Sequence, residues 1–208
     1  MSRLPDSTRA SDRSPLRILV VDDEPTLRLG FAYALTNATT QAETASNGAE
    51  ALERLAEKSF DAVVLDLRMP DVDGLAVIEA LRRRGDFTPV ILCSAYITVH
   101  SAVKAIHHHV VDFLMKPVKP VELRSAVKSV IHPGDSWLEK GLASARAGRL
   151  DQALDFLDAS DQGTLRESSW RRILKIMHEH PGELERIEFE LSESVLGQLA
   201  HQADNVRT

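Results

Sequence analysis

The sequence has a single cysteine, few aromatic residues and no long apolar run. Cys93 lies in an apolar stretch, so a disulfide framework is excluded and we expect a small core residue in a reducing compartment. No apolar stretch reaches the roughly 20 residues that span a bilayer. The polar segment 1–15 has no apolar signal-peptide core. We therefore expect a disordered N-terminal tail on a soluble, cytoplasmic protein with no membrane partner.

Basic residues are outnumbered by acidic ones, 25 against 31. The formal net charge is -6, which argues against an electrostatic grip on nucleic acid as the main activity. Hydrophobic residues make up 43% of the chain, enough for a core. The length of 208 residues suits one medium domain followed by a smaller one.

Short apolar runs alternate with segments of helical period from Leu16 to about Ile131. The first run, Leu16–Val21, does not alternate with polar residues, as expected of a strand covered on both faces. This order predicts an α/β domain over residues 16–132, a doubly wound five-stranded parallel sheet with right-handed crossovers and helices on both faces. The five expected strands are 16–21, 42–45, 62–65, 89–93 and 110–115.

Charged residues follow three of these runs. Asp22 and Asp23 end the first run, Asp66 ends the third, and Lys116 ends the fifth. With strand order 2-1-3-4-5, a site forms outside the carboxyl ends of strands one and three, where the order reverses. Crowded carboxylates repel one another unless a cation lies among them, and Mg²⁺ prefers oxygen ligands. The residues predict a site for a divalent cation and a phosphoryl group, whose oxygens Lys116 and the Ser94 hydroxyl would contact.

Four signatures resemble the receiver domain of two-component response regulators, the CheY-like family. They occur in family order and spacing, at 20–24, 65–74, 94–95 and 113–117. The resemblance implies a flavodoxin-like fold with strand order 2-1-3-4-5. It also implies a phosphoprotein of phosphorelay signal transduction with Mg²⁺ as its cofactor.

The resemblance assigns roles at the acid cluster. Asp66 would accept the phosphoryl group from the phosphohistidine of a histidine kinase. Asp23, Asp66 and the Arg68 carbonyl would bind Mg²⁺, and Asp22 would act largely through water. An aspartate-nucleophile phosphatase is the rival class, but it needs a second acid where Arg68 stands. We therefore do not expect an enzyme.

The resemblance also implies a switch. Ser94 and Phe113 would form the switch pair, and Lys116 would contact the phosphate, with a cis bond to Pro117. The sequence departs from the family at His109, where glycine is usual. Glycine eases the turn after the preceding helix, so we expect strain at this corner.

The tail after the break at 132–134 contains no strand-like run. We expect a small all-helical output domain over 136–208, with helices at 137–147, 150–159, 165–178 and 183–201. Its first helical pair is similar to one tetratricopeptide repeat. A lone repeat cannot bury its own face well, so a hairpin completed by the later helices is the alternative.

Three functions of the tail stay open. It has nine basic against thirteen acidic residues and no recognisable helix-turn-helix, metal-ligand pattern or phosphate loop. We expect a protein partner or a homodimer through the helical domain, with nucleic acid an unlikely partner. A DNA-binding transcriptional regulator and an unrecognised enzyme are the alternatives.

Overall fold

The computed structural model describes residues 14–95, 99–131, 137–158, 171, 173–175 and 177–179. Its strands are β1 (Leu16–Val21), β2 (Thr40–Ala45), β3 (Ala62–Asp66), β4 (Val90–Ser94) and β5 (Asp112–Met115). Its first five helices are α1 (Pro25–Leu35), α2 (Gly48–Glu57), α3 (Gly74–Arg83), α4 (Val99–His107) and α5 (Pro120–Ile131). Two helices of the tail follow, α6 (Trp137–Arg146) and α7 (Leu150–Asp158).

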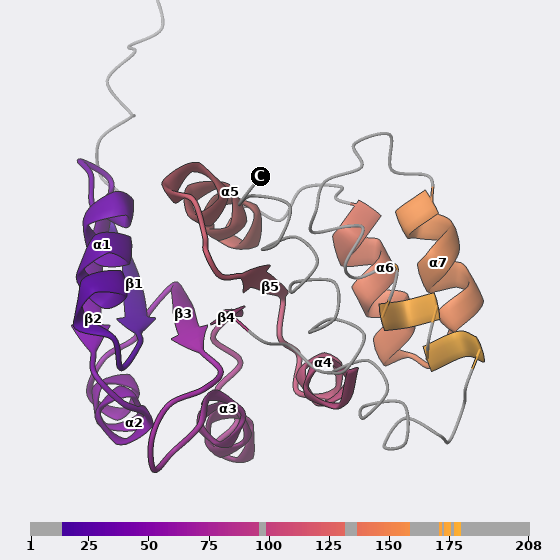
Figure 1. Cartoon of the computed structure of the whole chain (residues 1–208), viewed down its shortest axis with the longest axis horizontal. Coiled ribbons are helices and arrows are strands. Elements are labelled where there is room, and N and C mark those ends of the chain that lie inside the picture. Colours follow the sequence, from indigo (N-terminus) through magenta and orange to yellow (C-terminus); the bar gives the residue numbers. More distant parts are fainter. Residues whose placement is uncertain are drawn as a thin grey trace, which may run out of the picture.

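The strands form one parallel sheet in the order β2-β1-β3-β4-β5. The predicted fold class and strand order are therefore confirmed. The order reverses at β1 and β3, whose carboxyl ends lie side by side (Figure 1). The division of the chain into 1–15, 16–132 and 136–208 stays a prediction. The expected tail 1–15 lies almost wholly outside the described residues, as does the expected helix 183–201.

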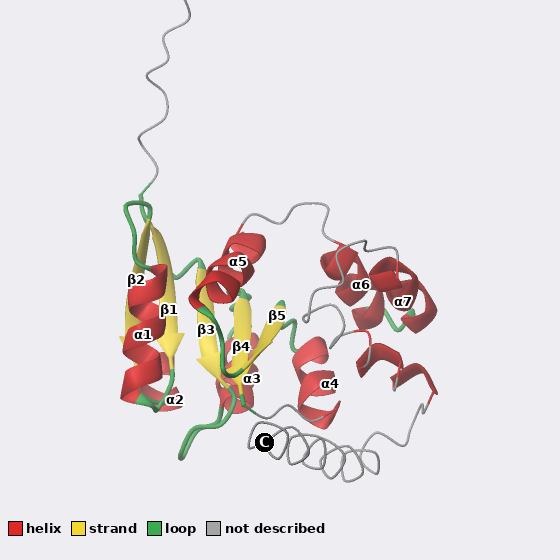
Figure 2. Ribbon diagram, turned by 45° about the horizontal axis from the view of Figure 1, so that its top comes forward, coloured by secondary structure: helices red, strands yellow, loops and turns green. Residues whose placement is uncertain are grey.

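Alternate residues of each strand feed two separate cores, because successive strand side chains point to opposite faces. Ile18 and Val20 pack with α1 and α5 on one face. Leu19 and Val21 belong to the core on the other face, with residues of α2, α3 and α4. This second core also takes in α6 and α7, which lie beyond β5, with α6 the nearer of the two to α4 (Figure 2).

A reciprocal cap starts α2. The Asn47 side chain accepts a hydrogen bond from the Glu50 N–H, and the Glu50 carboxylate accepts one from the Ser46 N–H at 2.7 Å. The Ser46 N–H and hydroxyl and the Arg54 guanidinium lower the pKa of Glu50 to about 2. The ionised carboxylate therefore stabilises the fold.

Glu50→Gln should lower the free energy of unfolding by about 1 kcal/mol at neutral pH. The contribution is fully present above the ordinary pKa of 4.5 and is lost as the pH falls toward about 2. Urea titrations at neutral pH and at about pH 3 check this, since the difference in unfolding free energy between the two proteins should shrink in acid. The exposed Glu53→Gln variant on the same helix is the control. A loss of unfolding free energy of the same size at both pH values would contradict a stabilising role for the ionised Glu50 carboxylate.

The corner between α4 and β5 turns through a residue with positive φ. His109 has φ 55°, a left-handed conformation that glycine adopts with less strain. This left-handed residue stands at the corner where the missing glycine led us to expect strain. In the part of the chain that the structure describes, no helix is both long and apolar enough to cross a bilayer.

Candidate functional site

Three carboxylates meet at the carboxyl ends of β1 and β3. One oxygen each from Asp22, Asp23 and Asp66 lie within 4.8 Å of one another. Asp22 and Asp66 are buried, with 1% and 6% of their surfaces exposed, whereas Asp23 is exposed. The cluster is therefore open to solvent on the Asp23 side. The site residues that the sequence placed at two separate strand ends are together in space.

Lys116 bridges the two buried carboxylates. Its Nζ lies 2.8 Å from Asp22 Oδ2 and 2.6 Å from Asp66 Oδ2. Burial lowers the pKa of Lys116, but the hydrogen bonds to both carboxylates outweigh it and the net pKa is raised. The lysine is therefore held in its charged form. One ammonium against three carboxylates leaves the cluster short of positive charge, which suits a divalent cation.

Burial raises the pKa of Asp66, although hydrogen bonds from Lys116 and from the Arg68 N–H oppose this shift. The Arg68 N–H donates to Asp66 Oδ1 at 3.1 Å. The Glu24 N–H similarly donates to Asp22 Oδ1 at 2.9 Å. Main-chain donors thus fix the orientation of both buried carboxylates and leave the exposed edge of the cluster for a ligand.

Gly74 lets the loop after Asp66 fold back tightly. The Gly74 N–H donates to the Leu67 carbonyl at 3.0 Å. A Cβ atom at Gly74 would lie 2.4 Å from the Asp66 carbonyl oxygen. Asp73 caps α3 by accepting from the Ala76 N–H, and Asp71 has φ 64° in the loop. These two acids are therefore loop and cap residues, and the cluster does not include them.

Arg28 is a contributor that the sequence analysis missed. Its Nη1 donates to the Asp22 carbonyl at 2.7 Å and to the Asp23 carbonyl at 3.4 Å. The guanidinium thereby fixes the main chain that carries the acid pair, and it adds positive charge behind it. Its place one turn into the helix that follows the acids is the signal that could have revealed it.

Ser94 and Phe113 occupy the positions expected of them at the neighbouring strands. Ser94 ends β4 with 1% of its surface exposed, and its carbonyl accepts from the Lys116 N–H at 2.9 Å. Phe113 lies on β5, is 4% exposed and belongs to the core on the α4 side of the sheet. The Lys116–Pro117 peptide bond is cis. The switching role of the pair stays a prediction.

The donor set fits Mg²⁺, because carboxylate and carbonyl oxygens are the hard ligands that this ion prefers. The cluster contains no thiol or imidazole that would favour a softer metal. The fold and this cluster at the strand-order reversal define a CheY-like receiver. Residues 18–128 match the family described as response regulator receiver domain, which is more than half of the chain. The chain belongs to this family.

Curated relatives share this part of the chain. The DNA-binding transcriptional regulator NtrC of Escherichia coli K12 is 37% identical over 114 residues, 55% of this chain and 24% of NtrC. The response regulator MprA of Mycobacterium sp. strain KMS is 34% identical over 153 residues, 74% of this chain and 63% of MprA. The chain thus covers less than two thirds of either relative.

Solved structures agree with the fold. Chemotaxis protein CheY4 of Vibrio cholerae superposes with a TM-score of 0.54 at 26% identity, over 56% of this chain and 99% of CheY4. A response regulator receiver protein of Pseudomonas putida superposes with a TM-score of 0.52 at 30% identity, over 56% of this chain and 98% of that protein. None of these matches bears on the tetratricopeptide likeness of the tail, which stays a prediction.

Proposed function

We propose that this chain is a phosphorylated response regulator in which Asp66 accepts a phosphoryl group from a histidine kinase. The observation that carries the proposal is the buried Asp66 carboxylate held between Lys116 and the Arg68 N–H, beside two further acids. A carboxylate oxygen of Asp66 attacks the phosphorus of a phosphohistidine. A P–O bond forms as the P–N bond breaks, and the imidazole leaves.

The surrounding residues supply orientation and charge. Lys116 is placed to bind an oxygen of the incoming group, and the Ser94 hydroxyl would bind another. Asp22, Asp23, Asp66 and the Arg68 carbonyl would hold Mg²⁺, which when bound supplies positive charge to the phosphoryl oxygens. Arg28 keeps the main chain of the acid pair in place.

The output is proposed to lie in the helical tail. The side chains of Phe113 and Ser94 would change position when Asp66 carries a phosphoryl group. This change would alter the surface of the tail that binds a protein partner or a second copy of the chain. The acidic balance of the tail supports a protein-interaction output. Cytoplasmic location and the absence of enzymatic turnover remain predictions.

DNA binding is the second candidate function. The relative NtrC is by name a DNA-binding transcriptional regulator, which weakens the expectation that nucleic acid is no partner. Fluorescence anisotropy of the full chain with duplex DNA across salt concentrations tests this. Specific binding should persist at salt concentrations that remove a purely electrostatic interaction.

The proposed acceptor is tested by incubating the full chain with Mg²⁺ and acetyl phosphate, a small phosphoryl donor. We expect one phosphoryl group per chain by intact mass, with borohydride reduction and peptide mapping placing it at Asp66. Chelation of Mg²⁺ should abolish the reaction. A label at another residue, or no label, would refute the proposal.

Lys116→Ala should still accept the phosphoryl group but fail to pass the change to the tail. The lysine is the contact between β5 and the acid cluster, so its removal separates acceptance from response. Both tryptophans, Trp137 and Trp170, lie in the tail, and their fluorescence reports on it. A phosphorylation-dependent fluorescence change should occur in the wild type and vanish in this variant. Its persistence would show that another residue carries the signal.

A further inference from the structure

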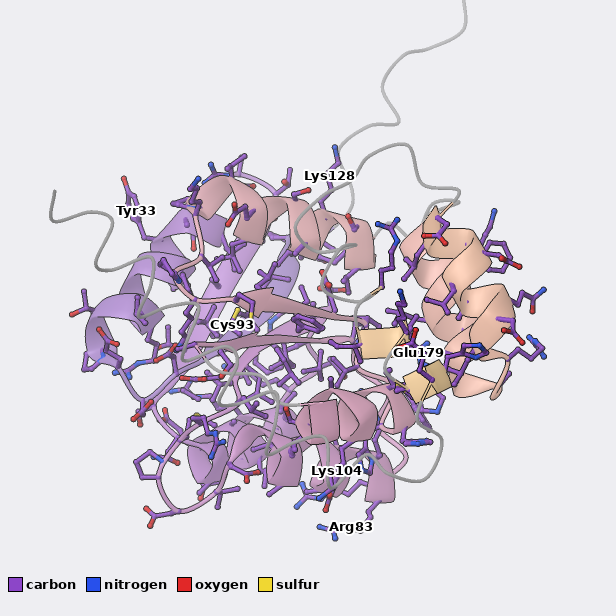
Figure 3. All side chains as sticks on the ribbon, turned by 45° about the vertical axis from the view of Figure 1, so that its right-hand side comes forward. Tyr33, Arg83, Cys93, Lys104, Lys128 and Glu179 are labelled. Atoms are coloured by element: carbon purple, nitrogen blue, oxygen red, sulfur yellow. The ribbon has the colours of Figure 1, made fainter. Side chains whose placement is uncertain are left out.

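Basic side chains gather where α3 and α4 end. Arg82 and Arg83 close α3 and Arg84 is its C-cap, while Lys104 lies in the last turn of α4. The two helices are neighbours on one face of the sheet, and Figure 3 shows Arg83 and Lys104 projecting on the same side of the molecule. Each helix leads into the next strand of a parallel sheet, so these ends lie at the amino edge of the sheet. The acid cluster lies at the opposite edge.

The outer charges of this group are not neutralised by neighbouring acids. Arg83, Arg84 and Lys104 are exposed, and among the residues that the structure describes none of the three forms an ion pair. Two acids of the same region have partners of their own. Asp86 accepts the N–H and the hydroxyl of the residue two positions further on, and Glu79 lies 3.6 Å from a histidine nitrogen of the turn after α4. An acidic chain of net charge -6 thus carries unpaired positive charge at one edge.

Two arginines behind this surface strengthen the positive potential. The half-buried guanidinium of Arg82 donates to four main-chain carbonyls in the segments that enter β4 and β5, at 2.7 to 3.4 Å. Arg146 of α6 donates to the Val110 carbonyl at 2.8 Å. Burial and the nearby charges of Arg146 and Arg82 lower the pKa of His109. The potential at this edge therefore disfavours further positive charge and attracts an anion.

An exposed aromatic ring stands among these charges. Phe87 is 63% exposed and belongs to neither hydrophobic core. The guanidinium carbon of Arg82 lies over the ring, 5.6 Å from its centroid, and the ring of His109 meets it edge-on at 5.9 Å. Two neighbours thus hold the ring in place while most of its surface faces solvent. A flat ring held in this way beside cations is a platform on which a nucleic-acid base can stack.

We propose that this edge binds single-stranded nucleic acid, with backbone phosphates on Arg83, Arg84 and Lys104 and a base stacked on Phe87. Arginine suits phosphate because its guanidinium donates two parallel hydrogen bonds. A single strand suits Phe87 because the bases of a duplex are already stacked and would have to be extruded. An acidic protein segment would pair with the arginines but would leave the exposed ring without a use. The inference goes beyond the proposed phosphoryl acceptor and does not depend on it, since Asp66 lies at the opposite edge of the sheet.

Fluorescence anisotropy of the full chain with a labelled oligodeoxythymidine of about 15 nucleotides tests this surface. Combining Arg83→Gln with Arg84→Gln should weaken binding about tenfold or more in low salt. It should also make the slope of log affinity against log salt shallower by about 1.4, since each phosphate contact on a single strand contributes about 0.7. Phe87→Ala should weaken binding about fivefold or more and leave the salt slope unchanged, because a stacked base carries no charge.

Lys119→Gln combined with Lys128→Gln is the matched control. It removes the same charge from exposed side chains on α5 and just before it, and α5 packs on the other face of the sheet. Figure 3 shows Lys128 on the opposite side of the molecule from Arg83. The control should change the affinity by less than about twofold.

Three results would overturn the proposal. The first is no binding by the wild type in low salt, or full affinity in both patch variants, which would place any nucleic-acid site elsewhere. The second is equal weakening in the control and in the arginine variant, which would show only an effect of overall charge. The third is weakening in the arginine variant but not in Phe87→Ala, which would indicate a site for anions in general, such as acidic protein segments.

Discussion

Replacing Asp66 by asparagine should give a folded protein whose phosphoryl uptake from acetyl phosphate falls by about a thousandfold or more, as expected when a nucleophile is lost. The amide keeps the shape of the side chain, and its single oxygen can still accept from either the Arg68 N–H or Lys116. It lacks the anionic oxygen that attacks phosphorus. Intact mass after incubation with donor and Mg²⁺ measures the loss.

The same substitution should also change how Mg²⁺ affects stability. Burial raises the pKa of Asp66, so its ionised form costs folding free energy at neutral pH. Without Mg²⁺ the variant should therefore be at least as stable as the wild type, and it should gain less from added Mg²⁺. Thermal unfolding with and without the ion checks both. Asp71→Asn, an exposed acid of the same loop, is the control and should keep full phosphoryl uptake. Uptake retained in Asp66→Asn would refute Asp66 as the acceptor.

Gly74→Ala adds a single methyl group, and near the site this addition should destabilise the fold the most. Its Cβ would lie 2.4 Å from the Asp66 carbonyl oxygen and 3.0 Å from Leu67 Cα, both main-chain atoms that cannot rotate away. Overpacking of this kind costs about 1–3 kcal/mol. The shift that relieves it must move the chain carrying Asp66, so phosphoryl uptake should slow as well. Urea unfolding and the rate of uptake measure the two effects.

Gly30→Ala is the matched control. Gly30 lies on the exposed face of α1, and nothing lies within 4 Å of an added Cβ. Alanine in a helix interior stabilises it by about 0.5–1 kcal/mol relative to glycine. The two glycine variants should therefore move stability in opposite directions. Equal stability in both variants would contradict the close approach at Gly74.

The sequence was sufficient for the sheet and for the acid cluster. Apolar runs define the largely buried strands β1, β3 and β4, and the reversal of strand order brings Asp22 and Asp66 together whatever the details of the loops. Contacts of long side chains with main-chain carbonyls were not predictable. The bonds of Arg28 to the acid pair and of Arg146 to Val110 depend on the positions of helices, which no local pattern encodes.

The α4–β5 corner has one feature that the sequence predicted and others that it did not. The missing glycine predicted strain at this corner, and the φ of His109 is positive there. What the sequence could not show is how the corner is held. Arg82 of α3 donates to the carbonyls of His108 at 2.7 Å and His109 at 3.4 Å, and the ring of Phe87 meets His109 edge-on. Neighbouring elements thus support the left-handed residue.

Cys93 makes the protein convenient for single-site chemistry. The thiol is buried in β4, and burial raises its pKa, so little thiolate forms at neutral pH. Figure 3 shows it in the interior, whereas Tyr33 projects from the surface. A cysteine introduced at Tyr33 should therefore take a maleimide dye selectively in the native background. The slow rate at which the Cys93 thiol itself reacts would then report how often the sheet opens.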